Sequence, residues 1–249
     1  MSEKITCVRQ SIKDWPENER PRERLLLFGP KTLSNAELLA IFLRTGIQGK
    51  SARDLAQELL NQFGGLRGLY SVEDKELGKI KGLGPAKIAQ LRAAIELSNR
   101  YLAEALKEKP VLNQPQLIYE YLLHSMRDLP QEEFKILLLN QKLRLIEQID
   151  AFKGTLTQSS IYPREIIKLA LRYGADSLVF AHNHPSGDSQ PSKLDKALTR
   201  ELILACQSVQ VKVADHIIIG DNCYFSFSEA GLLKKYQQQV TQVMEVQEL

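Results

Sequence analysis

One segment constrains this chain more than any other: an apolar run leads into two histidines and is followed by an acid at a helix start. Residues 175–181 (ADSLVFA) are bounded by Gly174 and by a Pro/Ser/Gly loop, which predicts a buried strand. Residues 192–208 have helical periodicity, and Asp195 falls in the first turn of that helix. A first-turn carboxylate can face back towards the end of the strand.

Two histidines leave the predicted strand together. His182 and His184 are two positions apart on an extended segment, so their side chains point the same way. Neutral imidazole nitrogens and a carboxylate oxygen suit zinc at about 2.0 to 2.2 Å, and three protein ligands leave a fourth tetrahedral position for water. We therefore predict one zinc ion held by His182, His184 and Asp195 in an open site.

Each of these residues also has an ordinary interpretation. Ser192 followed by Asp195 resembles a capping box, and Asn-His-Pro-Ser-Gly is common in loops. The combination favours the metal, because the chain has only four histidines and places two of them in one tripeptide, with an acid within reach.

The motif resembles that of a known family. HNHPSGDSQPSKLD is similar to the JAMM motif of MPN-domain metalloproteins: His-x-His-Pro, a serine, and an aspartate ten intervening residues after the second histidine. Together with residues 162–165 (YPRE), residues 215–220 (DHIIIG) and a helical N-terminal part, it resembles the bacterial RadC family over nearly the whole chain. The resemblance implies a zinc-dependent hydrolase fold related to deubiquitinating isopeptidases. It assigns His182, His184 and Asp195 as metal ligands and Ser192 as the motif serine.

The resemblance also implies a catalytic glutamate on an early strand of the domain. The candidate strand is residues 131–139 (QEEFKILLL), which offers Glu132 and Glu133. RadC-like sequences carry the acid two places before a phenylalanine, which selects Glu132 relative to Phe134. Adjacent strand residues face opposite sides, so only one of the two acids can point into the site. Glu133 stays an alternative.

Three further polar residues have two interpretations each. Ser192 can donate a hydrogen bond to a developing oxyanion, or it can serve only as a helix cap. Asp215 and His216 precede an apolar stretch, where they can orient a ligand imidazole from behind. The alternative for this pair is a buried, satisfied polar pair.

Composition is that of an ordinary globular protein. The chain has 249 residues, 43% hydrophobic and 25% charged, which allows two compact domains. Cys7, Cys206 and Cys223 lack paired spacing, so the sequence supports neither a disulfide framework nor a cysteine zinc site. No apolar leader and no run of about 18 apolar residues is present, which predicts a cytoplasmic protein without a membrane partner.

The N-terminal part has a modest basic excess and one suggestive turn. Residues 80–91 (IKGLGPAKIAQL) resemble a helix-hairpin-helix, in which Gly82 and Gly84 permit close backbone approach. Lys81, Lys87 and free helix amides suit a phosphate, which makes DNA a candidate partner. The alternative is a compact packing or protein-contact module.

A nucleotide site is not predicted. The stretch GIQGKS at residues 46–51 invites a phosphate-loop interpretation, but that motif needs glycine where this chain has Arg44.

The predicted organisation is an all-α helix-hairpin-helix domain over residues 1–106, a linker over 107–115, and an α/β domain over 116–249. The last is expected to be a mixed-sheet domain of the JAMM/MPN-like, cytidine-deaminase-like type. Its expected elements are helices over 116–126, 163–173 and 192–208, strands near 134–139, 143–152, 175–181, 211–219 and 223–228, and a short C-terminal helix with a tail.

The predicted function is hydrolysis of an amide or isopeptide bond, with a protein or peptide as substrate. One alternative is a DNA-repair or DNA-processing factor whose metal serves phosphodiester chemistry. A single metal with one base suits that chemistry less well than a two-metal clamp. Another alternative is a non-catalytic binding or scaffold protein, since fold alone does not guarantee activity.

Overall fold

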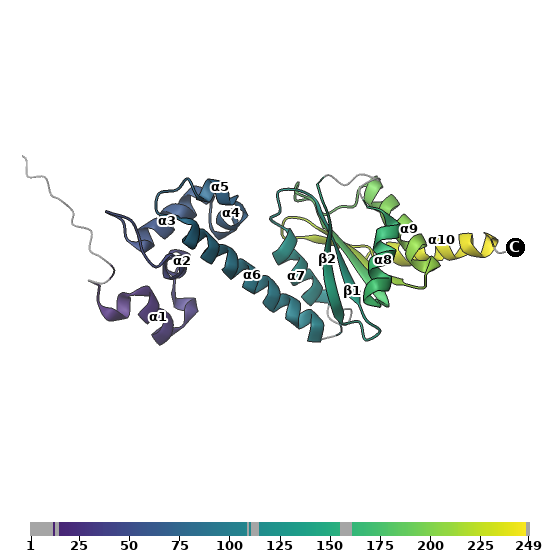
Figure 1. Ribbon diagram of the computed structural model, residues 1–249, viewed down its shortest axis with the longest axis horizontal. Helices are drawn as coiled ribbons and strands as arrows, with labels where there is room; N and C mark the ends of the chain where they lie inside the picture. Colours follow the sequence, from purple (N-terminus) through teal and green to yellow (C-terminus); the bar gives the residue numbers. More distant parts are fainter. Residues whose placement is uncertain (1–11, 13–14, 109, 111–114, 155–160, 248–249) are drawn as a thin grey trace, which may run out of the picture. The chain divides into compact units, whose positions relative to one another are not determined.

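The computed structural model describes residues 12, 15–108, 110, 115–154 and 161–247 (Figure 1). Two compact units form, Met1–Leu97 and Ser98–Leu249. The division falls inside helix α6 (Pro85–Glu108), upstream of the boundary expected at residue 106. The reason is local: Leu102, Ala103 and Leu106, late in α6, pack into a core of the C-terminal unit. Much of the expected linker, together with Cys7, lies outside the described residues.

The N-terminal unit is all-α, as predicted. Its helices are α1 (Pro21–Phe28), α2 (Asn35–Leu43), α3 (Ala52–Phe63), α4 (Leu66–Ser71), α5 (Asp74–Leu77) and the first part of α6, with short 3-10 turns η2 (Glu17–Glu19) and η3 (Pro30–Thr32). Helices α2 and α3 each begin with a capping box, in which a serine and an acid three residues later satisfy each other's backbone amides. Their leucine stripes form one apolar core.

The C-terminal unit is built around a five-stranded mixed sheet. Its elements are α7 (Pro115–Met126), β1 (Glu133–Leu139), β2 (Leu145–Lys153), α8 (Pro163–Tyr173), β3 (Ser177–Asn183), α9 (Lys193–Ser208), β4 (Lys212–Ile219), β5 (Tyr224–Ser226) and α10 (Leu232–Gln247). The strand order is β2-β1-β3-β4-β5, with β3 and β4 parallel and the other pairs antiparallel. The predicted α/β mixed-sheet class is confirmed.

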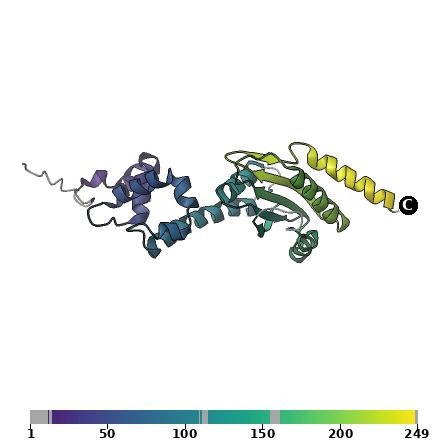
Figure 2. The ribbon, with the colours of Figure 1, turned by 90° about the horizontal axis from the view of Figure 1, so that it is seen from above.

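Helices cover both faces of this sheet (Figure 1 and Figure 2). Side chains that alternate along the central strands divide between two apolar cores. One core, with α8, α9 and α10, takes Phe134, Ile136, Leu138, Leu178, Phe180 and Ile218; the other, with α7 and the end of α6, takes Leu137, Leu139, Val179, Ala181, Ile217 and Ile219. Double coverage explains why β1 and β3 are buried along their whole length.

Among the elements that differ from their predicted bounds, two have a clear physical reason. Strand β3 continues to Asn183 because His182 stays in register with Phe134 of β1 and Ile218 of β4. Helix α10 runs for 16 residues, longer than the short helix expected, because Leu233, Tyr236 and Val240 recur at helical spacing and pack on the sheet. In the part of the chain that the structure describes, no helix combines the length and apolar character needed to span a membrane.

Candidate metal centre

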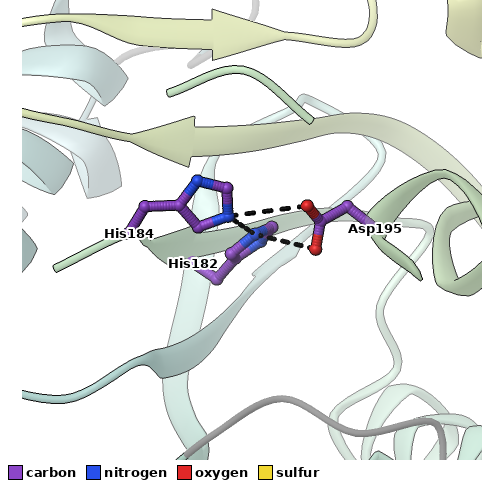
Figure 3. Close-up of side chains that lie close together, drawn as sticks. All are labelled: His182, His184 and Asp195. Atoms are coloured by element: carbon purple, nitrogen blue, oxygen red, sulfur yellow. Dashed lines mark hydrogen bonds and ion pairs between the residues drawn. The ribbon is translucent and has the colours of Figure 1, made fainter. Parts of the chain in front are cut away.

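The three predicted ligands come together at one end of the sheet. His182 lies near the end of β3, His184 directly follows that strand, and Asp195 lies in the first turn of α9. One potential ligand atom from each lies within 4.8 Å of the others. Figure 3 shows both imidazoles directed at the Asp195 carboxylate.

The distances within this group are short. His182 Nε2 lies 3.3 Å from Asp195 Oδ1, and His184 Nε2 lies 3.5 Å from Asp195 Oδ2. The two Nε2 atoms are 3.1 Å apart. His182 is completely buried and Asp195 is 5% exposed, so packing within the fold fixes the positions of these side chains.

Asp195 is a helix cap and a candidate ligand at the same time. The Ser192 backbone amide donates to Asp195 Oδ2 at 2.7 Å, and the Asp195 amide donates to Ser192 Oγ at 3.1 Å. This capping box fixes the carboxylate at the helix start, where it faces the end of β3. The capping box is therefore observed, and it places the same carboxylate beside the two histidines, where its role as a metal ligand stays a prediction.

His184 has its ring orientation set by the loop that follows it. Its Nδ1 lies 2.7 Å from the backbone carbonyl oxygen of Asp188. A carbonyl only accepts hydrogen bonds, so Nδ1 carries the hydrogen, and in the neutral ring the lone pair is on Nε2. That lone pair faces the ligand group.

Charge coupling within the group is strong. Burial alone would raise the pKa of Asp195, but contact with the His182 and His184 imidazoles brings that pKa well below its usual range. Burial lowers the pKa of His182 against the opposing effects of Asp195 and Glu132. Asp195 raises the pKa of His184 against burial, and Asp188 and Glu132 act in the same direction as Asp195.

The donor set fits a zinc-type cation. Two imidazole nitrogens and a carboxylate converge from a strand end and a helix start, and each ligand is backed by a hydrogen bond from the scaffold. Three protein ligands would leave a coordination position for water or substrate.

Glu132 directly precedes β1, which begins at Glu133, and the two acids have different surroundings. Glu133 is buried and pairs with Lys153 of β2, with Glu133 Oε1 and Lys153 Nζ 3.1 Å apart. Glu132 has the same parity as Phe134, whose ring stacks at 6.2 Å from that of His182. The Glu132 charge acts on both ligand imidazoles. The geometry therefore favours Glu132 as the acid on the metal side of the sheet.

Asn183 holds the segment that carries these acids, a role the sequence interpretation missed. Its Oδ1 accepts from the Glu133 amide at 2.8 Å, and its Nδ2 donates to the Gln131 carbonyl at 3.1 Å. The Glu132 carbonyl in turn accepts from the Gly154 amide at 2.8 Å. An asparagine between two same-side histidines must face away from them, which is the signal that could have suggested this role.

The pair Asp215 and His216 divides into two different roles. The Asp215 carboxylate accepts hydrogen bonds from Ser226 Oγ and from the amides of His216 and Ser228, and burial raises its pKa to about 6. It is thus a buried, satisfied acid. The His216 ring instead contacts His182, with His216 Nε2 and His182 Nδ1 2.9 Å apart.

The predicted nucleic-acid residues surround the turn between α5 and α6. Gly82 has φ +95°, and a Cβ there would lie 2.3 Å from Ile47 Cγ2, so glycine is required by packing. Lys81 is exposed. Gly84 is exposed and its surroundings are open, whereas Lys87 Nζ donates to the Thr45 carbonyl at 2.6 Å. Packing explains Gly82 and Lys87, and DNA contact stays a prediction.

Comparison with known proteins covers both units. The family described as RadC-like JAB domain matches residues 112–232, and the family described as UPF0758 N-terminal matches residues 12–89. A UPF0758 protein of Aeromonas hydrophila subsp. hydrophila is 49% identical over 223 residues, which covers 90% of this chain and 100% of the relative. A UPF0758 protein of Nitrosomonas eutropha is 50% identical over 223 residues, with the same coverage of both chains. The predicted kinship is confirmed: the chain belongs to the RadC family of UPF0758 proteins.

Proposed function

We propose that this protein is a zinc-dependent hydrolase that cleaves an amide or isopeptide bond in a protein or peptide. The observation that carries the proposal is the convergence of His182, His184 and Asp195 within 4.8 Å at the end of the sheet. Membership of a family with a JAB domain supports the same class of chemistry.

The donor set decides which metal we propose. Two imidazoles and one carboxylate are ligands of catalytic zinc sites, whereas magnesium and calcium prefer sites made of oxygen ligands. A bound zinc ion supplies Lewis-acid polarisation of the scissile carbonyl and lowers the pKa of water towards about 7.

Glu132 is the residue proposed to move the proton. Its carboxylate accepts a proton from the attacking water and returns it to the nitrogen of the leaving amine. Its position directly before β1 and two residues before Phe134, whose ring stacks on that of His182, supports this role. Glu133 is engaged with Lys153 on the other side of the strand.

Ser192 is proposed to act chiefly through Asp195. Its hydroxyl oxygen accepts a hydrogen bond from the Asp195 amide, and this bond keeps the Asp195 carboxylate at the start of α9. An oxyanion contact would add a direct catalytic role, for which a loss of about 10² to 10³ in rate is typical.

The test combines metal analysis with a matched pair of variants. Protein from a zinc-replete preparation is expected to contain about one zinc per chain. We expect Glu132→Gln to keep the zinc and to lower kcat on peptide or isopeptide substrates by about 10²- to 10⁴-fold. Glu133→Gln, the control, should keep both zinc and activity. Zinc-free protein, or a Glu132→Gln variant with full activity, contradicts the proposal.

A further inference from the structure

We propose that Thr199 and His216 are positioning residues that hold His182 in one tautomer, with its hydrogen on Nδ1 and its lone pair on Nε2. Neither residue belongs to the ligand set. The inference deepens the proposed function and rests on it, because this tautomer is the one that leaves Nε2 free to bind a metal ion. It follows from the directions of three buried hydrogen bonds.

The first hydrogen bond fixes the Thr199 hydroxyl. Thr199 lies one turn after Asp195 on α9, and its Oγ1 is 2.6 Å from the Asp195 backbone carbonyl oxygen. A hydroxyl has one hydrogen, and a carbonyl oxygen has none to offer. The short contact therefore requires Thr199 to donate to Asp195, and its oxygen is left as an acceptor.

The second hydrogen bond fixes His216. Its Nδ1 lies 2.7 Å from Thr199 Oγ1, whose only hydrogen is donated to the Asp195 carbonyl. Nδ1 must therefore carry the hydrogen. The His216 ring is completely buried, and the Asp215 carboxylate binds the His216 backbone amide rather than the ring. Burial disfavours a charged imidazole, so the ring has a single hydrogen and Nε2 has only a lone pair.

The third hydrogen bond determines the tautomer of His182, the proposed metal ligand. His182 Nδ1 is 2.9 Å from His216 Nε2, and since His216 Nε2 has no hydrogen, His182 must donate. The neutral His182 ring then has its lone pair on Nε2. That lone pair points to Asp195 Oδ1 and His184 Nε2, at 3.3 and 3.1 Å.

The three bonds join two ligands through their supports. One path of hydrogen bonds runs from the Asp195 carbonyl through Thr199 and His216 to His182, and His182 Nε2 lies 3.3 Å from the carboxylate of the same Asp195. Aromatic packing holds the His216 ring, which stacks on Phe227 at 5.1 Å and meets Phe134 edge-on at 5.7 Å. Because the His216 ring is packed between these aromatic rings, it cannot easily rotate to compensate for a change in which of its nitrogens carries the hydrogen.

The decisive variants are Thr199→Val and its control Thr199→Ser. Valine keeps the shape of the side chain but removes the acceptor for His216 Nδ1. The His216 hydrogen then moves to Nε2, where it donates to His182 Nδ1. His182 must then carry its own hydrogen on Nε2, the metal-binding nitrogen. We expect zinc affinity, measured by chelator competition, to fall about 10- to 100-fold in Thr199→Val. Thr199→Ser keeps the hydroxyl and should bind zinc like the wild type.

A spectroscopic readout separates this role from simple packing. In ¹⁵N NMR of metal-free protein, protonated and unprotonated ring nitrogens have distinct chemical shifts. We expect hydrogen on Nδ1 of both His182 and His216 in the wild type and in Thr199→Ser, and on Nε2 of both rings in Thr199→Val.

Two results overturn the inference. One is a folded Thr199→Val variant with wild-type zinc affinity; the other is a wild-type spectrum with the His182 hydrogen on Nε2. The second measurement needs no variant, so it decides the matter even if Thr199→Val does not fold. Loss of the proposed hydrolytic activity is distinguishable, because inactive protein that shows the expected affinities and tautomers contradicts only the proposed function.

Discussion

Helices α3 and α9 begin with the same capping box, but among the described residues only α9 contributes to the candidate metal centre. In α3 the Ser51 amide donates to Asp54 Oδ2 at 3.1 Å, and in α9 the Ser192 amide donates to Asp195 Oδ2 at 2.7 Å. The return bonds, from the acid's amide to the serine hydroxyl, are 3.1 Å in both. The two helix starts therefore share the same pair of capping-box hydrogen bonds, and in α3 Ser51 Oγ also donates to Asp54 Oδ2 at 2.9 Å.

The two helix starts differ in which side chains the fold places near the capping carboxylate. All four histidines of the chain belong to residues 98–249, and strand β3 delivers two of them to the start of α9. Helix α3 instead follows the loop at residues 46–51. A capping box is thus a local solution to helix initiation, and it becomes a ligand site only when a sheet brings imidazoles to the same carboxylate.

The largest expected effect comes from removing the acid at each helix start. Asp195→Asn should weaken zinc binding by more than about 100-fold, because it removes a ligand rather than a residue that supports one. Asp54→Asn should leave zinc affinity unchanged, although both variants lose a capping interaction. Chelator competition measures the affinity. Equal zinc loss in the two variants would remove the distinction between them.

The second prediction concerns Asn183 of β3, the strand that faces the start of α9. The described part of the N-terminal unit, which contains α3, is all-α and has no such strand. Asn183→Ala should keep zinc but lower kcat by about 100-fold, because the segment that carries Glu132 is no longer held in place. The free energy of unfolding should fall by about 1 to 3 kcal/mol, since a buried amide loses its partner. Urea unfolding and steady-state kinetics check both. Unaltered kcat with the expected loss of stability would restrict Asn183 to a structural role.

A third prediction uses pH on the metal-free protein. The pKa of Asp195 lies below 3.8 in the folded state, so its contribution to stability is present above pH 3.8 and is lost on acidification. The pKa of His184 is raised above 6.5 by Asp195, so its contribution is present below pH 6.5 and is lost as pH rises. The stability advantage of wild type over Asp195→Asn should therefore be greatest between pH 3.8 and 6.5, at about 1 to 3 kcal/mol. Denaturant titrations across pH measure it, and a pH-independent difference would argue against this coupling.

The smallest expected effect is on the serines. Ser192→Ala and Ser51→Ala should each lower the free energy of unfolding by about 1 kcal/mol, the usual loss for a helix cap. If Ser192 acts through Asp195 alone, kcat should fall less than tenfold, well short of the roughly 10²- to 10³-fold loss of an oxyanion donor. Thermal unfolding and kinetics provide the comparison. A kcat loss of the larger size in Ser192→Ala would establish the direct role instead.

Sequence patterns predicted the parts of the site that are close together in the chain. His182 and His184 share a strand, and Asp195 follows within one loop and one helical turn, so local periodicity was enough to bring them together. Strand alternation indicated only that Glu132 and Glu133 face opposite sides, and the choice of Glu132 came from the family resemblance and stays a prediction. The order of the strands was not predicted, because pairing between β1, β3 and β4 depends on contacts far apart in sequence.

The supporting residues were harder to find for the same reason. Thr199 and His216 are on different elements, and only the pairing of β3 with β4 under α9 brings them to His182. Asn183 acts on backbone atoms about fifty positions away. The sequence also did not predict that Leu106, with Leu102 and Ala103 late in α6, packs into a core shared with α7 and the sheet.

The aromatic layer behind the ligands has a consequence for metal exchange in the cell. Phe134, Phe180 and Phe227 pack beneath His182 and His216, within a core made from the sheet and three helices. The site is therefore preorganised by folding, unlike small zinc modules that are unfolded without their ion. We expect a chelator to remove the ion while the circular dichroism spectrum stays folded. A protein built in this way would be able to lose the proposed ion and bind it again without unfolding.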